Sequence, residues 1–218
     1  MSVVPGWWSG ARRFGRGVDL RALASRVGGF DALRHGGADA LIEAGVNPER
    51  AHRWVASPCE QTPWHVLTLA DPRYPVALRV VPGAPAVLEV QGSIEALSPP
   101  AVAVVGTRDC TSYGSAVARH LAHALAVAGV SVVSGLARGI DGHAHRAAAA
   151  AGRTVAVVAH GLSHTAPAMH GRLRGEIVQA GGAVVSALAN GVEPRPWQFP
   201  IRNQWVAGLA EAVVVVEA

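Results

Sequence analysis

From residue 101 onward, short runs of almost entirely apolar residues recur at intervals long enough to hold a helix between them. Strands that are buried on both faces of a parallel sheet have this uninterrupted apolar composition. The runs predict five strands, at Ala101–Val105, Val130–Val133, Thr154–Val158, Ala183–Ser186 and Ala212–Val216. The alternation of strand and helix is typical of a doubly wound, mostly parallel α/β sheet.

The segment between the first two strands shows helical spacing clearly. Apolar residues recur there every three or four positions, at Val117, Leu121, Leu125 and Ala128. Glycine commonly ends a helix because it adopts a left-handed conformation without strain. We therefore expect helices that end near Gly129 and Gly152, with the apolar stripe of the first facing the sheet.

The first sixty residues have a different pattern, in which short amphipathic segments are separated by glycines. They predict helices at Asp19–Val27, Phe30–Leu33, Asp39–Ala44 and Asn47–Val55. Helices of this length are not stable alone, so we expect a small N-terminal helical domain over residues 1–60, acting as a cap or a partner-docking module. Residues 61–218 are expected to form the second domain. It begins with two more predicted strands, at Val66–Leu69 and Ala86–Val90, and the expected linker is Ser98-Pro99-Pro100.

Two of the predicted strands run directly into glycine-rich turns that carry an arginine. The first strand opens into Gly106-Thr107-Arg108, and the second into a turn that contains Gly135, Arg138 and Gly139. Glycine lets the backbone approach a ligand, N–H groups at a helix start attract anions, and arginine binds phosphate through paired hydrogen bonds. Because ligands of such sheets bind at the carboxyl ends of the strands, we expect both turns to line one phosphate-binding crevice.

A third segment, after the fourth strand, combines aromatic, basic and amide side chains. It reads Pro194-Arg195-Pro196-Trp197-Gln198-Phe199-Pro200-Ile201-Arg202-Asn203. Aromatic rings stack on exposed bases while arginines hold the backbone, which is how proteins grip single-stranded nucleic acid. The alternative is that Trp197 and Phe199 only anchor the loop or belong to the core.

Other side chains of the turns also have a structural alternative. Arg138 either binds phosphate or pairs with Asp141 inside its own turn, and Asp141 is expected to be only an N-cap of the following helix. Thr107 and Ser112 either donate a hydrogen bond to phosphate or cap a helix. Arg108 has no such local role, so we expect it to bind phosphate.

Composition and charge narrow the class of ligand. All 19 basic side chains are arginine, which excludes a Walker phosphate loop because that loop needs a lysine. The first turn lacks Gly-x-Gly-x-x-Gly, and no acidic residue occurs between Asp109 and Asp141, which argues against a dinucleotide cofactor. Residues 1–95 carry 10 arginines and 9 acids, and residues 96–218 carry 9 arginines and 6 acids. The part of the chain with the turns therefore holds +3 of the net charge of +4, which favours an anionic partner.

Other kinds of chemistry have little support in the sequence. The two cysteines are too few for a disulfide framework, and the histidines at 143, 145, 160, 164 and 170 match no zinc spacing. No serine lies in a nucleophile-elbow motif. We expect no metal, no cofactor and no catalytic residue. Without a signal-peptide pattern or an apolar run of roughly 18 residues, the expected location is the cytoplasm, with no membrane contact.

Together these motifs resemble the DNA-processing protein A family (DprA, also called Smf) over residues 66–218. The most specific string is Ser134-Gly135-Leu136-Ala137-Arg138-Gly139-Ile140-Asp141, followed by His145. The other strings are Asp71-Pro72-Arg73-Tyr74-Pro75, Pro85-Ala86-Val87-Leu88 with Gly92, Val104-Val105-Gly106-Thr107-Arg108, Tyr113-Gly114 and Phe199-Pro200-x-Arg202-Asn203. The resemblance implies an extended Rossmann-like domain, preceded here by the small helical domain.

The resemblance further implies a protein without catalytic activity that binds and protects single-stranded DNA and assists the loading of a RecA-type recombinase in natural transformation. The DNA-binding residues expected on these grounds are Gly106, Thr107, Arg108, Gly135, Arg138, Gly139, Phe199, Arg202 and Asn203. The first three would cradle a backbone phosphate, Phe199 would stack or wedge against a base, and Arg202 with Asn203 would complete the basic pocket.

Departures from the family pattern leave two alternatives open. Gln204 stands where the family usually has an arginine, and the loops after the third and fourth strands differ from the family's. The chain stops at Ala218, which predicts a fragment or a shortened homologue without the last helix and strand, the part implied in homodimer formation and recombinase contact. One alternative is a protein-interaction module that has lost DNA binding. The other is a nucleotide-binding, phosphoribohydrolase-like enzyme, whose Pro-Gly-Gly-x-Gly-Thr turn is absent here.

Overall fold

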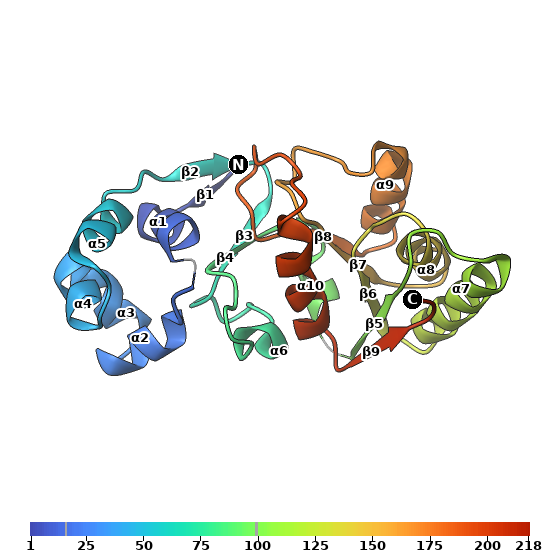
Figure 1. Cartoon of the computed structure of the whole chain (residues 1–218), viewed down its shortest axis with the longest axis horizontal. Coiled ribbons are helices and arrows are strands. Elements are labelled where there is room, and N and C mark those ends of the chain that lie inside the picture. Colours follow the sequence, from blue (N-terminus) through green and yellow to red (C-terminus); the bar gives the residue numbers. More distant parts are fainter. Residues whose placement is uncertain (16, 99) are drawn as a thin grey trace. The chain divides into compact units, whose positions relative to one another are not determined.

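The computed structural model of the chain describes residues 1–15, 17–98 and 100–218. These residues form two compact units (Figure 1), of which the first comprises residues 1–74 with 79–88 and the second residues 75–78 with 89–218. A domain boundary after residue 60 stays a prediction. In the expected linker, Pro99 lies outside the described residues.

The first unit contains the short helices that the sequence predicts. Its helices are α1 Gly6–Phe14, α2 Leu20–Arg26, α3 Phe30–His35, α4 Gly37–Glu43 and α5 Pro48–Val55. Helix α2 begins where expected because the carboxylate of Asp19 accepts hydrogen bonds from the N–H groups of Arg21 and Ala22, at 3.0 and 3.1 Å. The amide oxygen of Asn47 acts in the same way on α5, accepting from the N–H of Arg50 at 3.2 Å.

The first unit also contains elements that the sequence pattern did not indicate. Helix α1 packs against α5, and the buried Trp54 donates its indole N–H to the main-chain oxygen of Trp7 at 3.0 Å. The strands β1 Ser2–Val4 and β2 Glu60–Thr62 pair antiparallel. Strands this short carry no readable alternation, and they form only because two distant segments of the chain meet.

Among the described residues, seven strands form the main sheet, in the spatial order β3-β4-β8-β7-β6-β5-β9. Their bounds are β3 His65–Thr68, β4 Val87–Gly92, β5 Ala101–Val105, β6 Ser131–Ser134, β7 Thr154–Val157, β8 Ala183–Ser186 and β9 Ala212–Val215. The strands from β8 to β9 run parallel, and β4 is antiparallel to β8. The mostly parallel sheet is confirmed, and each of its parallel strands lies within one residue of the expected bounds.

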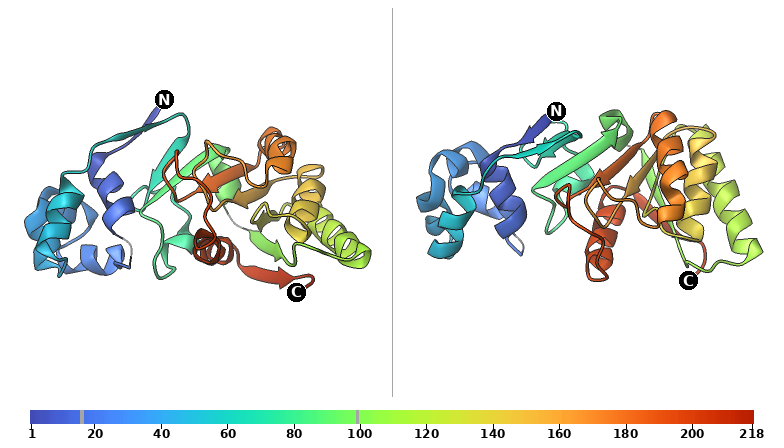
Figure 2. Two further views of the ribbon diagram at one scale, coloured as in Figure 1. Left: turned by 45° about the horizontal axis from the view of Figure 1, so that its top comes forward. Right: turned by 90° about the horizontal axis from the view of Figure 1, so that it is seen from above.

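Helices cover both faces of the parallel strands. Helices α7 Ser112–Val127, α8 Ile140–Ala149 and α9 Gly171–Gln179 form one layer, and α10 Gln198–Gly208 covers the opposite face (Figure 2). The chain moves from β5 to β8 in one direction and then returns through α10 to β9, on the far side of β5. The fold is therefore Rossmann-like, with its topological switch point between β5 and β9. Shorter helical turns lie at α6 Val76–Arg79, Ile94–Leu97 and Ala168–His170.

The buried face of α7 is shifted by one position from the expected stripe. The buried residues are Gly114, Ala118, Ala122 and Ala126, whereas Val117, Leu121 and Leu125 lie at the margin and Ala128 is exposed. The three alanines pack in one cluster with Ala144 and Ala148 of α8 and with Val104 and Val132 of the sheet. Small side chains let the helices approach closely, while the larger neighbours cover the margin. Side-chain size therefore decided which face of α7 is buried.

Candidate functional site

A cleft of about 510 Å³ opens at the switch point, where β5 and β9 end. Its walls come from the end of β5 with the first glycine turn, from α10, and from β9 with the residues after it. The lining residues are Val105, Gly106, Thr107, Arg108, Ala137, Asp141, Phe199, Arg202, Asn203, Val206, Ala207, Val213, Val215, Glu217 and Ala218. All of them belong to the second unit.

The guanidinium groups of two arginines lie close to the ring of Phe199 in this cleft. The guanidinium carbon of Arg108 lies 5.2 Å from the centroid of the Phe199 ring, and that of Arg202 lies 5.9 Å from it. Arg108 is exposed, and none of the described carboxylates pairs with it. Two cations in such proximity repel one another, and an anion between them removes that repulsion. The cleft therefore offers an aromatic surface beside two cations, while the carboxylates of Asp141 and Glu217 also belong to its lining.

Arg202 forms the floor of the cleft. It is 4 % exposed and donates from Nη1 to the main-chain oxygen of Val157 at 3.1 Å. Its Nε is buried and has no hydrogen-bond partner within the described part of the chain. Burial lowers the pKa of Arg202, the Asp141 carboxylate raises it, and Arg108 lowers it further. Gly135 packs against this side chain. A residue with a Cβ at this position would displace the guanidinium, because the Cβ would lie 1.4 Å from Arg202 Nη1.

Asp141 organises the second glycine turn from within. Its Oδ2 accepts hydrogen bonds from the main-chain N–H groups of Gly135, at 3.1 Å, and Ala137, at 3.3 Å. Burial raises the pKa of Asp141, while Arg202 and the hydrogen bonds oppose that rise. The expectation that Asp141 only caps α8 is wrong. Gly139 occupies the N-cap position, and Asp141 lies in the first turn of the helix, only 6 % exposed.

Arg138 is held by the first turn and does not pair with Asp141. Its guanidinium forms an ion pair with Asp109, and its Nε donates to the main-chain oxygen of Arg108 at 3.3 Å. Both partners of this ion pair are more than half exposed, so the pair adds little stability. It does direct the Arg138 side chain toward the first turn.

The two glycine turns touch at Gly139. Its φ is +78°, and a Cβ on this residue would lie 2.3 Å from the main-chain oxygen of Thr107. The N–H of Ile140 donates to the same oxygen at 3.2 Å. The two turns thus meet at one edge of the sheet. The first turn contributes its glycine and arginine to the lining of the cleft, whereas the second contributes Ala137 and Asp141. That this crevice binds phosphate stays a prediction.

Several main-chain N–H groups of the first turn donate within the protein. The N–H of Thr107 donates to the main-chain oxygen of Glu217 at 2.7 Å, and that of Asp109 to Thr107 Oγ1 at 3.3 Å. The N–H of Thr111 donates to the Glu217 carboxylate at 3.0 Å. Thr111, and not Ser112, is the N-cap of α7. The side chains of the arginines, more than the backbone of this turn, are therefore left to hold an anion.

Six of the nine residues predicted from the sequence come together at the cleft. They are Gly106, Thr107, Arg108, Phe199, Arg202 and Asn203. The other three, Gly135, Arg138 and Gly139, do not line it. They support it instead, because Gly135 makes room for Arg202 and the other two join the turns.

Sequence reasoning missed the apolar wall of the cleft. This wall includes Val213 and Val215 of β9, which are 49 % and 59 % exposed, and Val206 and Ala207 of α10. The available signal was the spacing of Val213 and Val215, because residues two apart in a strand share a face. This spacing could not be assigned to a cleft from the sequence, because the position of β9 beside β5 was not known.

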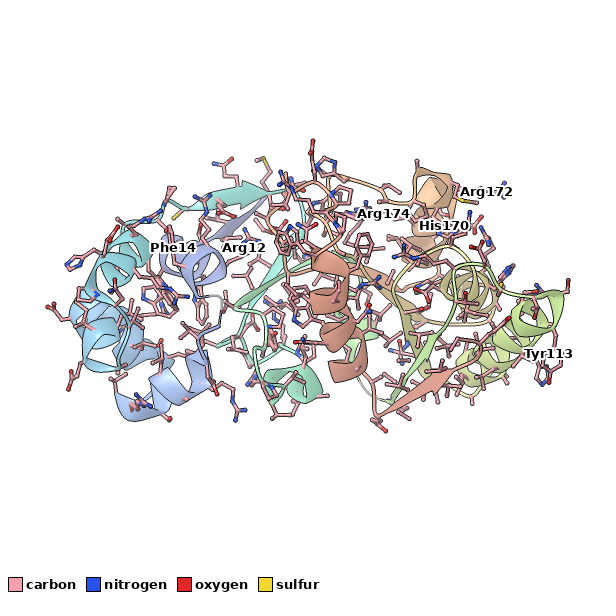
Figure 3. The ribbon with its side chains drawn as sticks, viewed as in Figure 1. Arg12, Phe14, Tyr113, His170, Arg172 and Arg174 are labelled. Atoms are coloured by element: carbon pink, nitrogen blue, oxygen red, sulfur yellow. The ribbon has the colours of Figure 1, made fainter. Side chains whose placement is uncertain are left out.

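Two buried histidines lie close to this polar floor. His145 is fully buried, its Nδ1 lies 2.8 Å from Thr154 Oγ1, and its Nε2 has no partner among the described residues. Burial lowers the pKa of His145 to about 3, and His170 and Arg202 act in the same direction. His170, labelled in Figure 3, is also buried, with its Nδ1 3.0 Å from the main-chain oxygen of Leu136.

Two further properties concern the described residues as a whole. No group of three or more histidine, cysteine, aspartate or glutamate side chains in them is placed to hold a metal ion. No helix in the described ranges is both long enough and apolar enough to cross a membrane.

Acid is expected to destabilise the protein through His145. In the folded state the ring stays neutral above about pH 3, whereas in the unfolded chain it binds a proton below roughly pH 6.5. The unfolded state binds more protons between these values, so this residue lowers the free energy of unfolding by about 1.4 kcal/mol per pH unit below pH 6.5. Urea unfolding at pH 7 and pH 5 measures the effect.

The matched variant is His145→Asn, whose amide nitrogen replaces Nδ1 and does not titrate. Between pH 7 and pH 5 this variant should lose about 2 kcal/mol less than the parent protein. The raised pKa of Asp141 acts with the opposite sign, but it is present in both proteins and cancels in the comparison. If the free energy of unfolding fell by the same amount in both proteins between pH 7 and pH 5, His145 would not be held neutral in the folded state.

The chain is similar to known proteins of one family. The family model described as DNA recombination-mediator protein A matches residues 65–218. Protein Smf of Escherichia coli (strain K12) is 36 % identical over 195 residues, which cover 84 % of this chain and 52 % of that protein. DNA processing protein DprA of Bacillus subtilis (strain 168) is 36 % identical over 155 residues, covering 70 % of this chain and 52 % of that protein. This chain spans about half the length of these curated relatives.

Two solved structures are similar to this one. The X-ray structure of DNA processing protein A from Streptococcus pneumoniae has a TM-score of 0.76 and 27 % sequence identity, and the match covers 96 % of this chain and 77 % of that chain. DNA processing protein A from Helicobacter pylori, described for its single-stranded DNA binding mode, has a TM-score of 0.63 and 28 % identity, and the match covers 72 % of this chain and 71 % of that chain.

Proposed function

Because this chain belongs to the DNA recombination-mediator protein A (DprA/Smf) family, we propose that its cleft binds the backbone of single-stranded DNA during DNA processing in transformation and recombination. The relative from Bacillus subtilis is named as a DNA processing protein, and the one from Helicobacter pylori is described as binding single-stranded DNA. The observation in this chain that carries the proposal is the ring of Phe199 with the guanidinium groups of both Arg108 and Arg202 close to it, at 5.2 and 5.9 Å from the ring centroid.

The chemistry of that arrangement fits a nucleotide. Arg108 is exposed and can form two parallel hydrogen bonds to a phosphate, and the bound phosphate would offset the repulsion between Arg108 and Arg202. Phe199 is partly exposed, so a base can stack on the part of its ring that the arginines leave open. Asn203 is exposed at the same cleft and offers an amide to a phosphate or a base edge.

The apolar wall supports a single strand over a duplex. Val213 and Val215 present apolar side chains to the cleft, opposite in character to the arginines. The face of an unpaired base is accessible and packs well on apolar and aromatic groups, whereas in a duplex these faces are stacked inside the helix. The cleft therefore combines one surface for phosphate with another for a base.

The proposal also extends to what happens to the bound strand, to oligomeric state and to catalysis. We propose that the bound strand is protected and passed to a RecA-type recombinase, that the protein acts as a homodimer, and that it catalyses no reaction. The supporting roles of Gly135, Arg138 and Gly139, which join and position the two turns, belong to the same proposal.

A binding titration across a salt series tests the proposal. A fluorescent oligothymidylate is titrated with the parent chain, with Arg108→Ala and with Arg172→Ala. Arg172 is the matched control, because its side chain is 92 % exposed on α9, does not line the cleft and pairs with Glu176 of the same helix (Figure 3). We expect Arg108→Ala to weaken binding about tenfold and to reduce the log–log salt slope by about 0.7, while Arg172→Ala changes the affinity less than about twofold.

Unlabelled duplex should compete poorly with the labelled single strand. Absence of binding at low salt would contradict the proposal and would favour the interaction module that has lost DNA binding. Equal losses in the two arginine variants would show that binding depends on general charge and not on the cleft. Release of free base from a nucleoside monophosphate would instead establish the phosphoribohydrolase-like enzyme.

A further inference from the structure

The residues after β9 close over the first glycine turn. The N–H of Val216 donates to the main-chain oxygen of Val105 at 3.0 Å, which extends the pairing of β9 with β5. The next main-chain oxygen, that of Glu217, accepts from the N–H of Thr107 at 2.7 Å. Gly106 leaves the room that this approach needs, because a Cβ there would lie 2.6 Å from the Glu217 oxygen. The backbone of Glu217 thus holds the start of the turn.

The side chain of Glu217 holds the other end of the same turn. The N–H of Thr111 donates to both carboxylate oxygens, at 3.0 and 3.3 Å, and Thr111 Oγ1 lies 3.2 Å from one of them. Thr111 caps α7, so the carboxylate lies at the positive end of that helix, where an anion is stabilised. Gly114 is needed here too, because a Cβ would lie 1.9 Å from Glu217 Oε2.

We infer that Glu217 is a positioning residue for DNA binding: it clamps residues 107 and 111 so that Arg108, between them, faces the cleft beside Phe199. This inference rests on the proposed function of the cleft. The carboxylate also occupies the start of α7, which an external anion would otherwise use. A backbone phosphate is thereby directed to the Arg108 side of the turn, where the aromatic ring and the apolar wall lie.

A double-mutant cycle tests whether Glu217 acts through Arg108. Glu217→Ala and Glu217→Gln are each made in the parent chain and in Arg108→Ala, and single-stranded DNA binding is measured at low salt. Glu217→Ala should weaken binding about fivefold in the parent and less than about twofold in the Arg108→Ala background. Glu217→Gln, whose amide oxygen still accepts from Thr111, should stay within about twofold of the parent.

Glu211→Ala is the matched control for charge. Glu211 is exposed and immediately precedes β9, so its removal changes the net charge as Glu217→Ala does without touching the turn. Thermal unfolding of every variant reports whether the fold is retained. The inference would be overturned if Glu217→Ala weakened binding equally in both Arg108 backgrounds or did not weaken it at all. It would also be overturned if Glu217→Ala raised the affinity and Glu211→Ala did not.

Amide hydrogen exchange gives a second readout that needs no DNA. Glu217→Ala should speed exchange at the N–H of Thr111 while the N–H of Gly135, which donates to Asp141, keeps its protection. Unchanged protection at Thr111 would overturn the inference independently. If the parent chain does not bind single-stranded DNA, the proposed function fails and the inference fails with it. If the parent binds and Arg108→Ala weakens binding, but Glu217→Ala does not, the inference alone fails.

Discussion

Replacing Gly139 with alanine is expected to lower the free energy of unfolding by about 3 kcal/mol or more, from backbone strain and overpacking together. The residue has a φ of +78° and a ψ of −132°, a region that side chains with a Cβ rarely adopt. The new Cβ would lie 2.3 Å from Thr107 O and 2.7 Å from the carbonyl carbon of Arg108. Both contacts are with main-chain atoms, so a rotamer change cannot relieve them. The two glycine turns must separate.

Gly129 provides a matched control for Gly139. Its φ is also +78°, but a Cβ there would meet no atom within 4 Å. Gly129→Ala should therefore cost only the backbone strain, about 1 kcal/mol. Urea unfolding of the two variants compares a positive-φ position without a close contact with one that has close main-chain contacts. Equal losses for the two substitutions would contradict the close approach of the two turns at Gly139.

Replacing the buried Arg202 with methionine is expected to destabilise the second unit by about 3–5 kcal/mol. The substitution removes the donor to Val157 O and the cation nearest the buried Asp141. A carboxylate left in the interior without its counter-charge carries its full desolvation cost. Chemical unfolding at pH 7 measures the loss, which should become smaller as the pH falls and the carboxylate of Asp141 takes up a proton.

The partner variant is Asp141→Asn, which keeps an oxygen acceptor for Gly135 and Ala137 and removes the charge. Once the charge at 141 is absent, the loss of Arg202 matters less. The double variant should therefore be about 1 kcal/mol or more better than the sum of the single variants. Additive losses would show that Arg202 does not stabilise the fold through Asp141, and would leave its hydrogen bond to Val157 and its packing as its contribution.

Much of the fold was predictable because its signals are local. The uninterrupted apolar runs of β5 to β9 and the capping side chains of Asp19 and Asn47 act within a few residues of their own positions. The effect of side-chain size on the buried face of α7 was harder to predict. The expected stripe contained Leu121 and Leu125, but α7 and α8 pack so closely that alanines occupy the buried positions. The pair β1 and β2 had no local signal at all.

The candidate site divides in a similar way. Gly106, Thr107 and Arg108 could be found from one strand–turn–helix pattern, and Phe199 with Arg202 from one aromatic and basic segment. The roles of the residues around them depended on partners far away in the chain. Asp141 was expected to cap a helix, but the buried N–H groups of its turn required an acceptor, and its carboxylate provides one.

The sequence by itself determined which segments could be predicted to contribute to the candidate site, because strand composition, glycine turns and arginines are properties of neighbouring residues. Only the tertiary structure decided which of these segments face one another. The return of β9 to the side of β5 creates the cleft, supplies its apolar wall and brings Glu217 to the first turn. Those contacts join residues about a hundred positions apart, and no short pattern encodes them, since they depend on the order of the strands across the whole sheet.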